Sequence, residues 1–441
     1  MNIFIFRRDF RLYDNLGLIN AIKNCKNILP IFIFTPEQIK NNEFKSDNAI
    51  QFLVESLHDL NKQLKKYNSK LHIFYGTNLS VLNKINNIDK ISNIFCNKDY
   101  TPYSKKRDMM IKTKYNLNHI EDYLLHDMGT LLKEDNTPYK VFTPFYNKAL
   151  TFKVNKPCKF KYSQYSFIKK KYDFMINLDY ISKFYNYNEN IFLNGGREKA
   201  LQRLKKVNLI NYNDTRNLLN IESSHLSPYI KYGCLSIREI YHKLKKKYTS
   251  KNKFFSQLYW REFYFYIIYY FPEVLGNPFN KKKISWKYNK SHFDCWKQGK
   301  TGFPIVDANM RQLNTTGYMH NRGRLIVSSF LTKLLHIDWQ LGEKYFATKL
   351  IDYDPAVNNG NWQWVAGTGV DYQQAFRILN PHTQTEKFDK DCKYIKKYVE
   401  ELQNIDNSII LNWHNVYNEY DFYINPIIVY KKARAQFLSI V

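Results

Sequence analysis

Short apolar runs alternate with amphipathic stretches over the first 130 residues. Apolar residues from Ile50 to Leu64 recur at helical spacing, and Ser46 precedes them as a helix cap. Four runs rich in Ile, Leu and Phe predict β-strands at Asn2–Phe6, Ile28–Phe34, Leu71–Tyr75 and Asn93–Cys96. Strands that alternate with helices across short connections predict a doubly wound, parallel α/β sheet in residues 1–130.

This rhythm changes in the rest of the chain. Residues 131–190 have no regular apolar period and become rich in Lys and Tyr, which predicts a long interdomain linker. From residue 191 to 441 the apolar pattern is helical, as Gly323–Ile337 illustrates. We therefore expect an α/β domain, a linker and an all-helical (all-α) domain.

Charge and cysteine usage narrow the class of protein. A formal net charge of +28 favours a polyanionic partner, but the abundance of Lys, Asn, Ile and Tyr also fits A/T-rich codons. The six cysteines are scattered without metal-ligand spacing, so we expect a reducing, intracellular compartment (cytoplasm or nucleus), no disulfides and no metal. No apolar run reaches 18 residues, so we expect a soluble protein without a membrane segment.

Two short stretches carry chemistry. Residues 352–364, DYDPAVNNGNWQW, combine carboxylates, carboxamides and indoles, which together can hold a planar aromatic heterocycle. Residues 223–233, SSHLSPYIKYG, place hydroxyls and backbone N–H groups at a predicted helix start, which suits a phosphate.

These stretches belong to an ordered set of motifs. The others are FRRDFRLYDNLGL (6–18), WREFY (260–264), KTGFPIVDANMRQLNTTGYMHNRGR (300–324) and GTGVDYQQAFRILNPHTQTEKFD (367–389). With them, nearly the whole chain resembles the DNA photolyase/cryptochrome family, and most closely its class I cyclobutane pyrimidine dimer photolyases. The resemblance implies an N-terminal antenna domain, a C-terminal FAD-binding catalytic domain and light-driven electron transfer from reduced FAD to a flipped-out dimer.

The resemblance also implies which residues contact FAD. Asn358 matches the position that faces flavin N5, and its neutral carboxamide fits the repair branch. An ion pair between Arg324 and Asp352 is expected beside the cofactor. The full set of matching positions is Tyr212, Ser223, Ser224, Leu226, Ser227, Arg261, Asn321, Arg324, Asp352, Asp354 and Asn358.

The resemblance also implies which residues transfer electrons and which contact the substrate. Trp286, Trp339 and Trp362 match the tryptophan chain that photoreduces the flavin, and Trp260 and Trp364 match the walls that sandwich a dimer. The remaining substrate positions are Arg216 and Arg322, with Gln257 where the dimer branch usually has Glu and Leu325 where it often has Met.

Three alternatives stay open: a cryptochrome photoreceptor, a (6-4) photolyase and a single-strand photolyase. The given sequence ends with residues 424–441, which resemble the end of the family's catalytic domain. Signalling members commonly carry a long C-terminal extension, so this favours repair. The (6-4) branch has histidines where this chain has Asn321 and Leu325. The single-strand branch tends to lose the aromatic sandwich that Trp260 and Trp364 preserve.

The expected partners are UV-damaged DNA, mainly double-stranded, and an antenna chromophore. Residues 97–108 resemble an antenna-domain segment, but Tyr103 and Ser104 stand where folate-binding members have Asn and Glu. A deazaflavin or flavin antenna is therefore favoured over methenyltetrahydrofolate, and absence of an antenna stays open. We expect a monomer that does not bind membranes.

Overall fold

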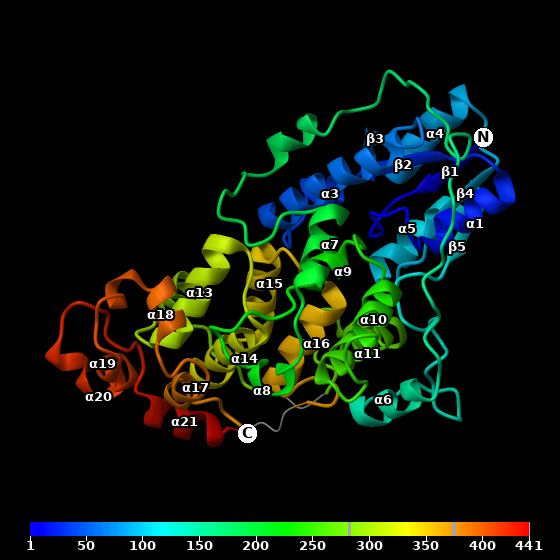
Figure 1. Ribbon diagram of the computed structural model, residues 1–441. Helices are drawn as coiled ribbons and strands as arrows, with labels where there is room; N and C mark the ends of the chain where they lie inside the picture. Colours follow the sequence, from blue (N-terminus) through cyan, green and yellow to red (C-terminus); the bar gives the residue numbers. More distant parts are fainter. Residues whose placement is uncertain (281–283, 373–375, 441) are drawn as a thin grey trace.

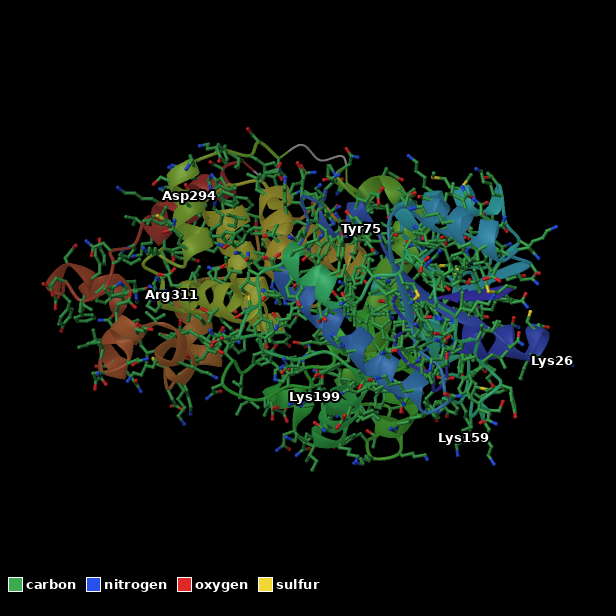
Figure 2. All side chains as sticks on the ribbon, turned by 90° about the horizontal axis from the view of Figure 1, so that it is seen from above. Lys26, Tyr75, Lys159, Lys199, Asp294 and Arg311 are labelled. Carbon is green, nitrogen blue, oxygen red and sulfur yellow. The ribbon has the colours of Figure 1, made fainter. Side chains whose placement is uncertain are left out.

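The computed structural model describes residues 1–441 apart from 281–283, 373–375 and 441. Part of the 367–389 motif therefore lies outside the described residues. Viewed from above, Lys26 of the α/β part and Arg311 of the helical part lie toward opposite ends of the molecule (Figure 2).

A five-stranded parallel sheet forms the N-terminal part (Figure 1). The strand order is β3-β2-β1-β4-β5, with β1 at Asn2–Ile5, β2 at Leu29–Phe34, β3 at His72–Tyr75, β4 at Asn93–Asn97 and β5 at Leu117–Ile120. The four predicted strands are confirmed. Strand β5 was not predicted, because it is an edge strand whose Asn118 and His119 are only half-buried and break the apolar run.

Both faces of the sheet are covered, as its nearly continuous apolar strands require. In β1, Ile3 and Ile5 belong to one buried cluster, while Phe4 and the following Phe6 belong to another. The flanking helices are α1 (Leu16–Cys25), α2 (Pro36–Ile39), α3 (Asp47–Lys65), α4 (Asn78–Ile88) and α5 (Pro102–Lys112). The predicted cap of α3 is confirmed, since Ser46 Oγ accepts a 3.2 Å bond from the N–H of Ala49.

The predicted linker packs against both parts of the molecule. Its first helix is α6 (Phe142–Leu150), which lies on α11 (Lys253–Tyr270) through Phe145 and Phe263, 5.3 Å apart between ring centroids. It then runs along the outside of the sheet, where the N–H of Ile168 donates to the carbonyl of Ile28 (Figure 1). A 3-10 helix, η1 (Asp179–Phe184), precedes the helical part. The domain boundaries at 130 and 190 stay predictions.

Helices dominate the C-terminal part, as predicted. They are α7 (Arg197–Lys206), α8 (Tyr212–Thr215), α9 (Ser227–Lys231), α10 (Ile237–Lys245), α11 (Lys253–Tyr270), η2 (Pro272–Val274), α12 (Lys290–Gln298), α13 (Pro304–Thr316), α14 (Asn321–Ser329), η3 (Phe330–Leu334), α15 (Trp339–Lys349), α16 (Pro355–Ala366), α17 (Pro381–Phe388), α18 (Lys393–Tyr398), η4 (Glu400–Leu402), α19 (Asn407–Leu411), α20 (Trp413–Val416), η5 (Tyr417–Glu419) and α21 (Tyr430–Leu438). The predicted helix over 323–337 is α14 followed by η3, a π-helical segment.

A buried charge cluster fastens the helical part to the sheet. Arg238 of α10 bonds Asp14, which follows β1, at 3.1 Å and Asp122, which follows β5, at 2.6 Å. The side chain of Arg238 is 4% exposed and those of the two aspartates at most 2%. Buried carboxylates need such a partner, so the pairing fixes the orientation of the two parts.

Substituting Arg238→Met should destabilise the protein by about 3–5 kcal/mol, because it leaves the buried Asp14 without a cation and Asp122 with Arg11 alone. Denaturant unfolding measures this change. Lys243→Met is the matched control on the same helix: it breaks the half-exposed pair with Glu239 and should cost only about 0.3–0.5 kcal/mol. Equal effects of the two substitutions would show that the Arg238 cluster does not hold the two parts together.

Candidate flavin and substrate site

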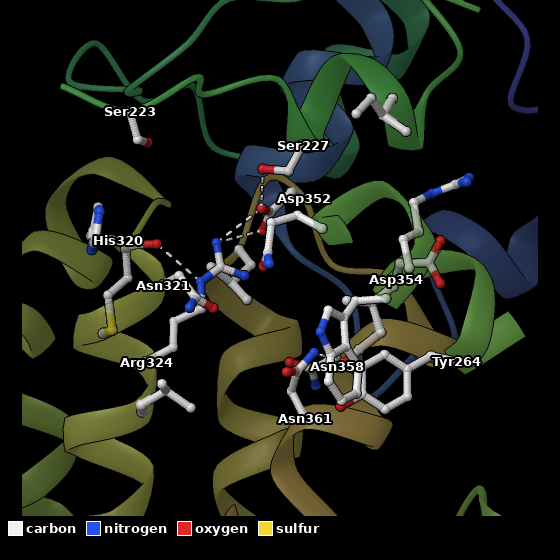
Figure 3. A pocket seen from close by; sticks show the side chains of 18 of the residues that line it. Ser223, Ser227, Tyr264, His320, Asn321, Arg324, Asp352, Asp354, Asn358 and Asn361 are labelled. Carbon is white, nitrogen blue, oxygen red and sulfur yellow. Dashed lines mark hydrogen bonds and ion pairs between the residues drawn. The ribbon is translucent and has the colours of Figure 1, made fainter. Parts of the chain in front are cut away.

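A cavity of about 430 Å³ opens between α9, α11, α14 and α16 (Figure 3). This volume lies within the range of about 300–1,000 Å³ that is usual for ligand sites. All eleven predicted FAD contacts line it: Tyr212, Ser223, Ser224, Leu226, Ser227, Arg261, Asn321, Arg324, Asp352, Asp354 and Asn358. Residues far apart in the sequence therefore share one cavity.

Paired charges form its polar wall. Arg324 Nη2 lies 2.9 Å from Asp352 Oδ2, so the expected ion pair is present (Figure 3). Ser227 Oγ donates to the same carboxylate at 2.6 Å, which ties α9 to the segment before α16. Asp352 therefore accepts bonds from both Arg324 and Ser227.

Helix α16 carries the central residues. Asp354 caps it, because its Oδ1 accepts from the N–H of Ala356 at 3.1 Å, and Asn358 follows one turn later. Gly360 allows close packing on α11: a Cβ there would lie 2.1 Å from the Tyr264 ring. Asn358 is buried at the cavity wall, and its Nδ2 donates to the carbonyl of Glu343 at 3.2 Å.

The carboxyl of Glu343 lies just behind this wall. It is buried, and its Oε2 accepts a 3.4 Å bond from Asn359 Nδ2. Burial raises the pKa of Glu343 to about 7, and the Asn359 bond only partly offsets this. Glu343 therefore carries a proton at mildly acidic pH.

The serine-rich segment begins α9, as predicted. The side chain of Arg203 donates to the carbonyls of Ser223 and Ser224, at 2.6 and 2.8 Å, and fixes the segment before Ser227. Across the cavity, Arg261 Nη2 is buried and has no hydrogen-bond partner among the described residues. An orphaned guanidinium N–H beside two carboxylates, a carboxamide and hydroxyls fits the donor and acceptor groups of FAD.

The two predicted aromatic walls both line the cavity but differ in support. Trp260 stacks face to face on Phe142 of α6, with centroids 3.8 Å apart and an interplanar angle of 8°. Phe142 in turn stacks on Tyr146 at 5.5 Å and 9°. Trp364 has no ring contact among the described residues. One wall is therefore part of a three-ring stack that begins in the linker.

The three predicted electron-transfer tryptophans differ in depth. Trp362 lines the cavity, Trp339 is buried at the start of α15, and Trp286 is half-buried. The N–H of Lys287 donates to the carbonyl of His336 at 2.7 Å, which joins the segments that carry Trp286 and Trp339. That the three indoles form an electron-transfer chain stays a prediction. The ring closest to Trp362 is that of Phe346, at 5.0 Å, and Trp296 lies 6.3 Å away.

The predicted substrate residues divide into two groups. Arg216, Gln257, Trp260, Leu325 and Trp364 line the cavity. Arg322 lies outside it: its Nη2 donates to Asn217 at 2.9 Å and its guanidinium sits 4.4 Å above Phe388. Burial and the neighbouring charges of Arg216 and Arg377 lower the pKa of Arg322 to about 10, so three guanidinium groups gather here.

Sequence reasoning missed several residues that shape the site. Arg8 reaches Asp354 from the N-terminal domain, and Phe142 supports Trp260 from the linker. Both lie more than a hundred positions from their partners, so no local spacing could pair them. Lys231, His320 and Tyr264 also line the cavity. The motif containing Arg8 was recognised, but its reach into the cavity was not.

We expected no metal, but one group of three potential metal ligands lies close together. Among the described residues, Cys96, Asp108 and His119 place ligand atoms within 4.8 Å of one another. Arg7 and Arg107 both pair with Asp108, at 2.8 and 2.9 Å, and already balance its charge.

No helix in the described part of the chain is long and apolar enough to cross a membrane.

With this geometry established, comparisons with known proteins identify the class. Residues 2–160 match the DNA photolyase family model, and residues 254–441 match that of the FAD-binding domain of DNA photolyase. The deoxyribodipyrimidine photo-lyase of Buchnera aphidicola is 36% identical, covering 100% of this chain and 96% of the relative. That of Escherichia coli is 31% identical, covering 98% of this chain and 97% of the relative.

Solved structures agree. An archaeal photolyase from Sulfolobus tokodaii, described with two FAD molecules, is 39% identical with a TM-score of 0.89, covering 100% of this chain and 99% of that one. A Synechocystis cryptochrome is 26% identical with a TM-score of 0.91, with the same coverage. This chain belongs to the DNA photolyase family. The predicted family, fold class and enzyme class, a photo-lyase, are confirmed.

The raised pKa of Glu343 predicts a pH-dependent stability. Its folded-state pKa, about 7, exceeds the ordinary 4.5, so its contribution is full below about pH 4.5 and is lost as the pH rises through 7. Glu343→Gln should remove this loss and gain roughly 3 kcal/mol over wild type at pH 8. Unfolding at pH 5 and 8 measures it, with the exposed Glu386→Gln as control. Parallel profiles for Glu343→Gln and wild type would contradict it.

Proposed function

We propose that this protein repairs cyclobutane pyrimidine dimers in DNA by light-driven electron transfer from reduced FAD. The observation that carries the proposal is one cavity with two kinds of wall. Asp352, Asp354 and Asn358 offer hydrogen bonds to a flavin, and the indoles of Trp260 and Trp364 line the same cavity. Cofactor and lesion can thus come close together.

The residues of the chain bind and orient the cofactor. Ser223, Ser224 and Ser227 offer hydroxyls to its phosphates, and Arg261 offers the unpaired Nη2. The carboxylates and Asn358 supply acceptors and a donor to the flavin ring. When bound, FAD supplies the light absorption and the electron for ring splitting. Under light, Trp362 at the wall would donate an electron to an oxidised flavin and would itself be oxidised.

The aromatic walls favour an extruded lesion. A dimer stacks and pairs poorly, so flipping it out costs less than flipping a normal nucleotide; photolyases are a named case of this rule. Contact with an aromatic face stabilises a base by about 1–3 kcal/mol. The stack of Trp260 on Phe142 keeps one wall in place before the lesion enters. Gln257 at the cavity lining can donate to and accept from a pyrimidine edge.

Three arginines next to the cavity suit the DNA backbone. Arg216, Arg322 and Arg377 gather near one another, and none forms an ion pair within the described residues. Guanidinium groups without carboxylate partners are available for phosphates, which give affinity without sequence preference. We propose that the partner is UV-damaged DNA, mainly double-stranded. We also propose that the enzyme is a monomer.

The antenna is also proposed. Tyr103 is exposed beside Arg107, and Ser104 is buried against Thr101, so this segment offers no Asn-Glu pair for a folate. The Sulfolobus tokodaii photolyase is described with a second FAD as a light-harvesting cofactor. We therefore favour a flavin or deazaflavin over methenyltetrahydrofolate.

The direct test is repair of an oligonucleotide with one cyclobutane dimer. Blue light should restore the intact pyrimidines and darkness should not. Parallel substrates with a (6-4) lesion, and with a dimer in single-stranded DNA, test the alternatives. A protein that repairs only the (6-4) substrate, or none of them while holding FAD, would contradict the proposal; the second result would favour a cryptochrome.

Trp260→Ala should weaken binding to the dimer by about 1–3 kcal/mol and leave FAD content unchanged.

Photoreduction and repair should separate in one variant. Trp362→Phe should slow light-driven reduction of the bound flavin, because phenylalanine gives up an electron far less readily than indole. Chemically pre-reduced Trp362→Phe should repair dimers almost as well as wild type. Absorption spectroscopy follows the first step and product analysis the second. An equal loss in both assays would refute the separate role of Trp362.

A further inference from the structure

The N-terminal domain inserts one charged side chain into the wall of the flavin cavity. Arg8 follows β1, and its Nη1 lies 2.7 Å from Asp354 Oδ2 at the start of α16. Its Nη2 lies 2.8 Å from Asp99 Oδ1, which follows β4. The Arg8 side chain is 18% exposed and that of Asp354 6%, so solvent screens this pair little.

A tyrosine of the same domain completes the contact. Tyr123 follows β5, and its hydroxyl lies 3.3 Å from Asp354 Oδ2. The guanidinium groups of Arg8 and Arg261 lie 4.3 and 4.0 Å from its ring centroid. Its carbonyl accepts a 3.1 Å bond from Arg261 Nη1, which leaves Nη2 of Arg261 free at the cavity. Thus Arg8 and Tyr123 hold two cavity residues, Asp354 and Arg261.

The charge of Arg8 matters because Asp354 is buried. Removing the cation from a buried ion pair is costly, because it leaves the carboxylate without a partner of opposite charge. Burial lowers the pKa of Arg8, but the charges of Asp99 and Asp354 outweigh it and raise that pKa above its ordinary value. Arg8 is therefore charged, and it supplies a cation 2.7 Å from the carboxylate of Asp354.

Geometry as well as charge depends on this pair. Asp354 uses Oδ2 for Arg8 and Oδ1 for the N–H of Ala356, so the carboxylate is fixed in one orientation. The carbonyl of Asp354 accepts from the N–H of Asn358 at 2.8 Å. The start of α16, and with it Asn358, is therefore anchored to the N-terminal domain.

We propose that Arg8 is a positioning residue of the flavin site, by which the N-terminal domain holds Asp354 in place and oriented toward the cofactor. This inference rests on the proposed placement of FAD in the cavity. It gives the N-terminal domain a part in cofactor binding that does not depend on an antenna chromophore.

The test follows the release of FAD from the purified holoprotein at pH 7, through the fluorescence that FAD recovers when free. Arg8→Gln should release FAD roughly tenfold faster than wild type or more, because it removes the cation that holds Asp354.

Three further variants isolate the cause. Arg7→Gln is the matched control, because Arg7 pairs with Asp108 inside the N-terminal domain, and it should release FAD like wild type. Asp354→Asn should release FAD quickly, and adding Arg8→Gln to it should change little, because Arg8 acts through Asp354. Arg8→Lys keeps the charge but lacks the fork that bridges Asp99 and Asp354, so its release rate should fall between those of wild type and Arg8→Gln.

Two results would overturn different proposals. If Arg8→Gln releases FAD at the wild-type rate while Asp354→Asn releases it quickly, Arg8 has no positioning role. If Asp354→Asn and Arg324→Gln also retain FAD like wild type, the placement of the cofactor itself is wrong. Should Arg8→Gln fail to fold, the comparison of Arg8→Lys with Arg7→Gln decides: equal release rates would remove the proposal.

Discussion

Two carboxylates on one cavity wall set the main physical constraint on this structure. Asp352 and Asp354 are two residues apart, and burying each without a cation would cost on the order of several kcal/mol. Arg324 of α14 balances the first and Arg8 of the N-terminal domain the second. These pairs fix how α14, α16 and the sheet meet, and hence the shape of the cavity.

The substrate side of the cavity depends on packing more than on charge. Trp260 keeps one face at the cavity while Phe142 covers the ring in a parallel stack. Because Phe142 belongs to the linker, this segment is part of the site and not only a connection. Arg216, Arg322 and Arg377 lack carboxylate partners among the described residues, which leaves them available to an anionic partner.

Much of this could be predicted from sequence, for identifiable reasons. Buried parallel strands and the amphipathic α3 leave local patterns, and the flavin-binding stretch is a dense run of unusual residues. Strand β5 was missed because its polar residues hide the pattern. Arg8 and Phe142 were missed because their partners lie far away in the chain. Arg322 was expected at the lesion or at a phosphate around the pocket, and it lies outside the cavity on Phe388. Pairs of residues that lie this far apart in the sequence can be identified only from the three-dimensional structure.

The most direct test of the account is a crystal structure of the protein purified with its flavin. We expect the isoalloxazine ring to lie within hydrogen-bonding distance of Asp354 and Asn358. The ion pairs of Arg8 with Asp354 and of Arg324 with Asp352 should be intact. A flavin bound elsewhere, or a cavity closed by its own side chains with Asp354 turned away from Arg8, would contradict it.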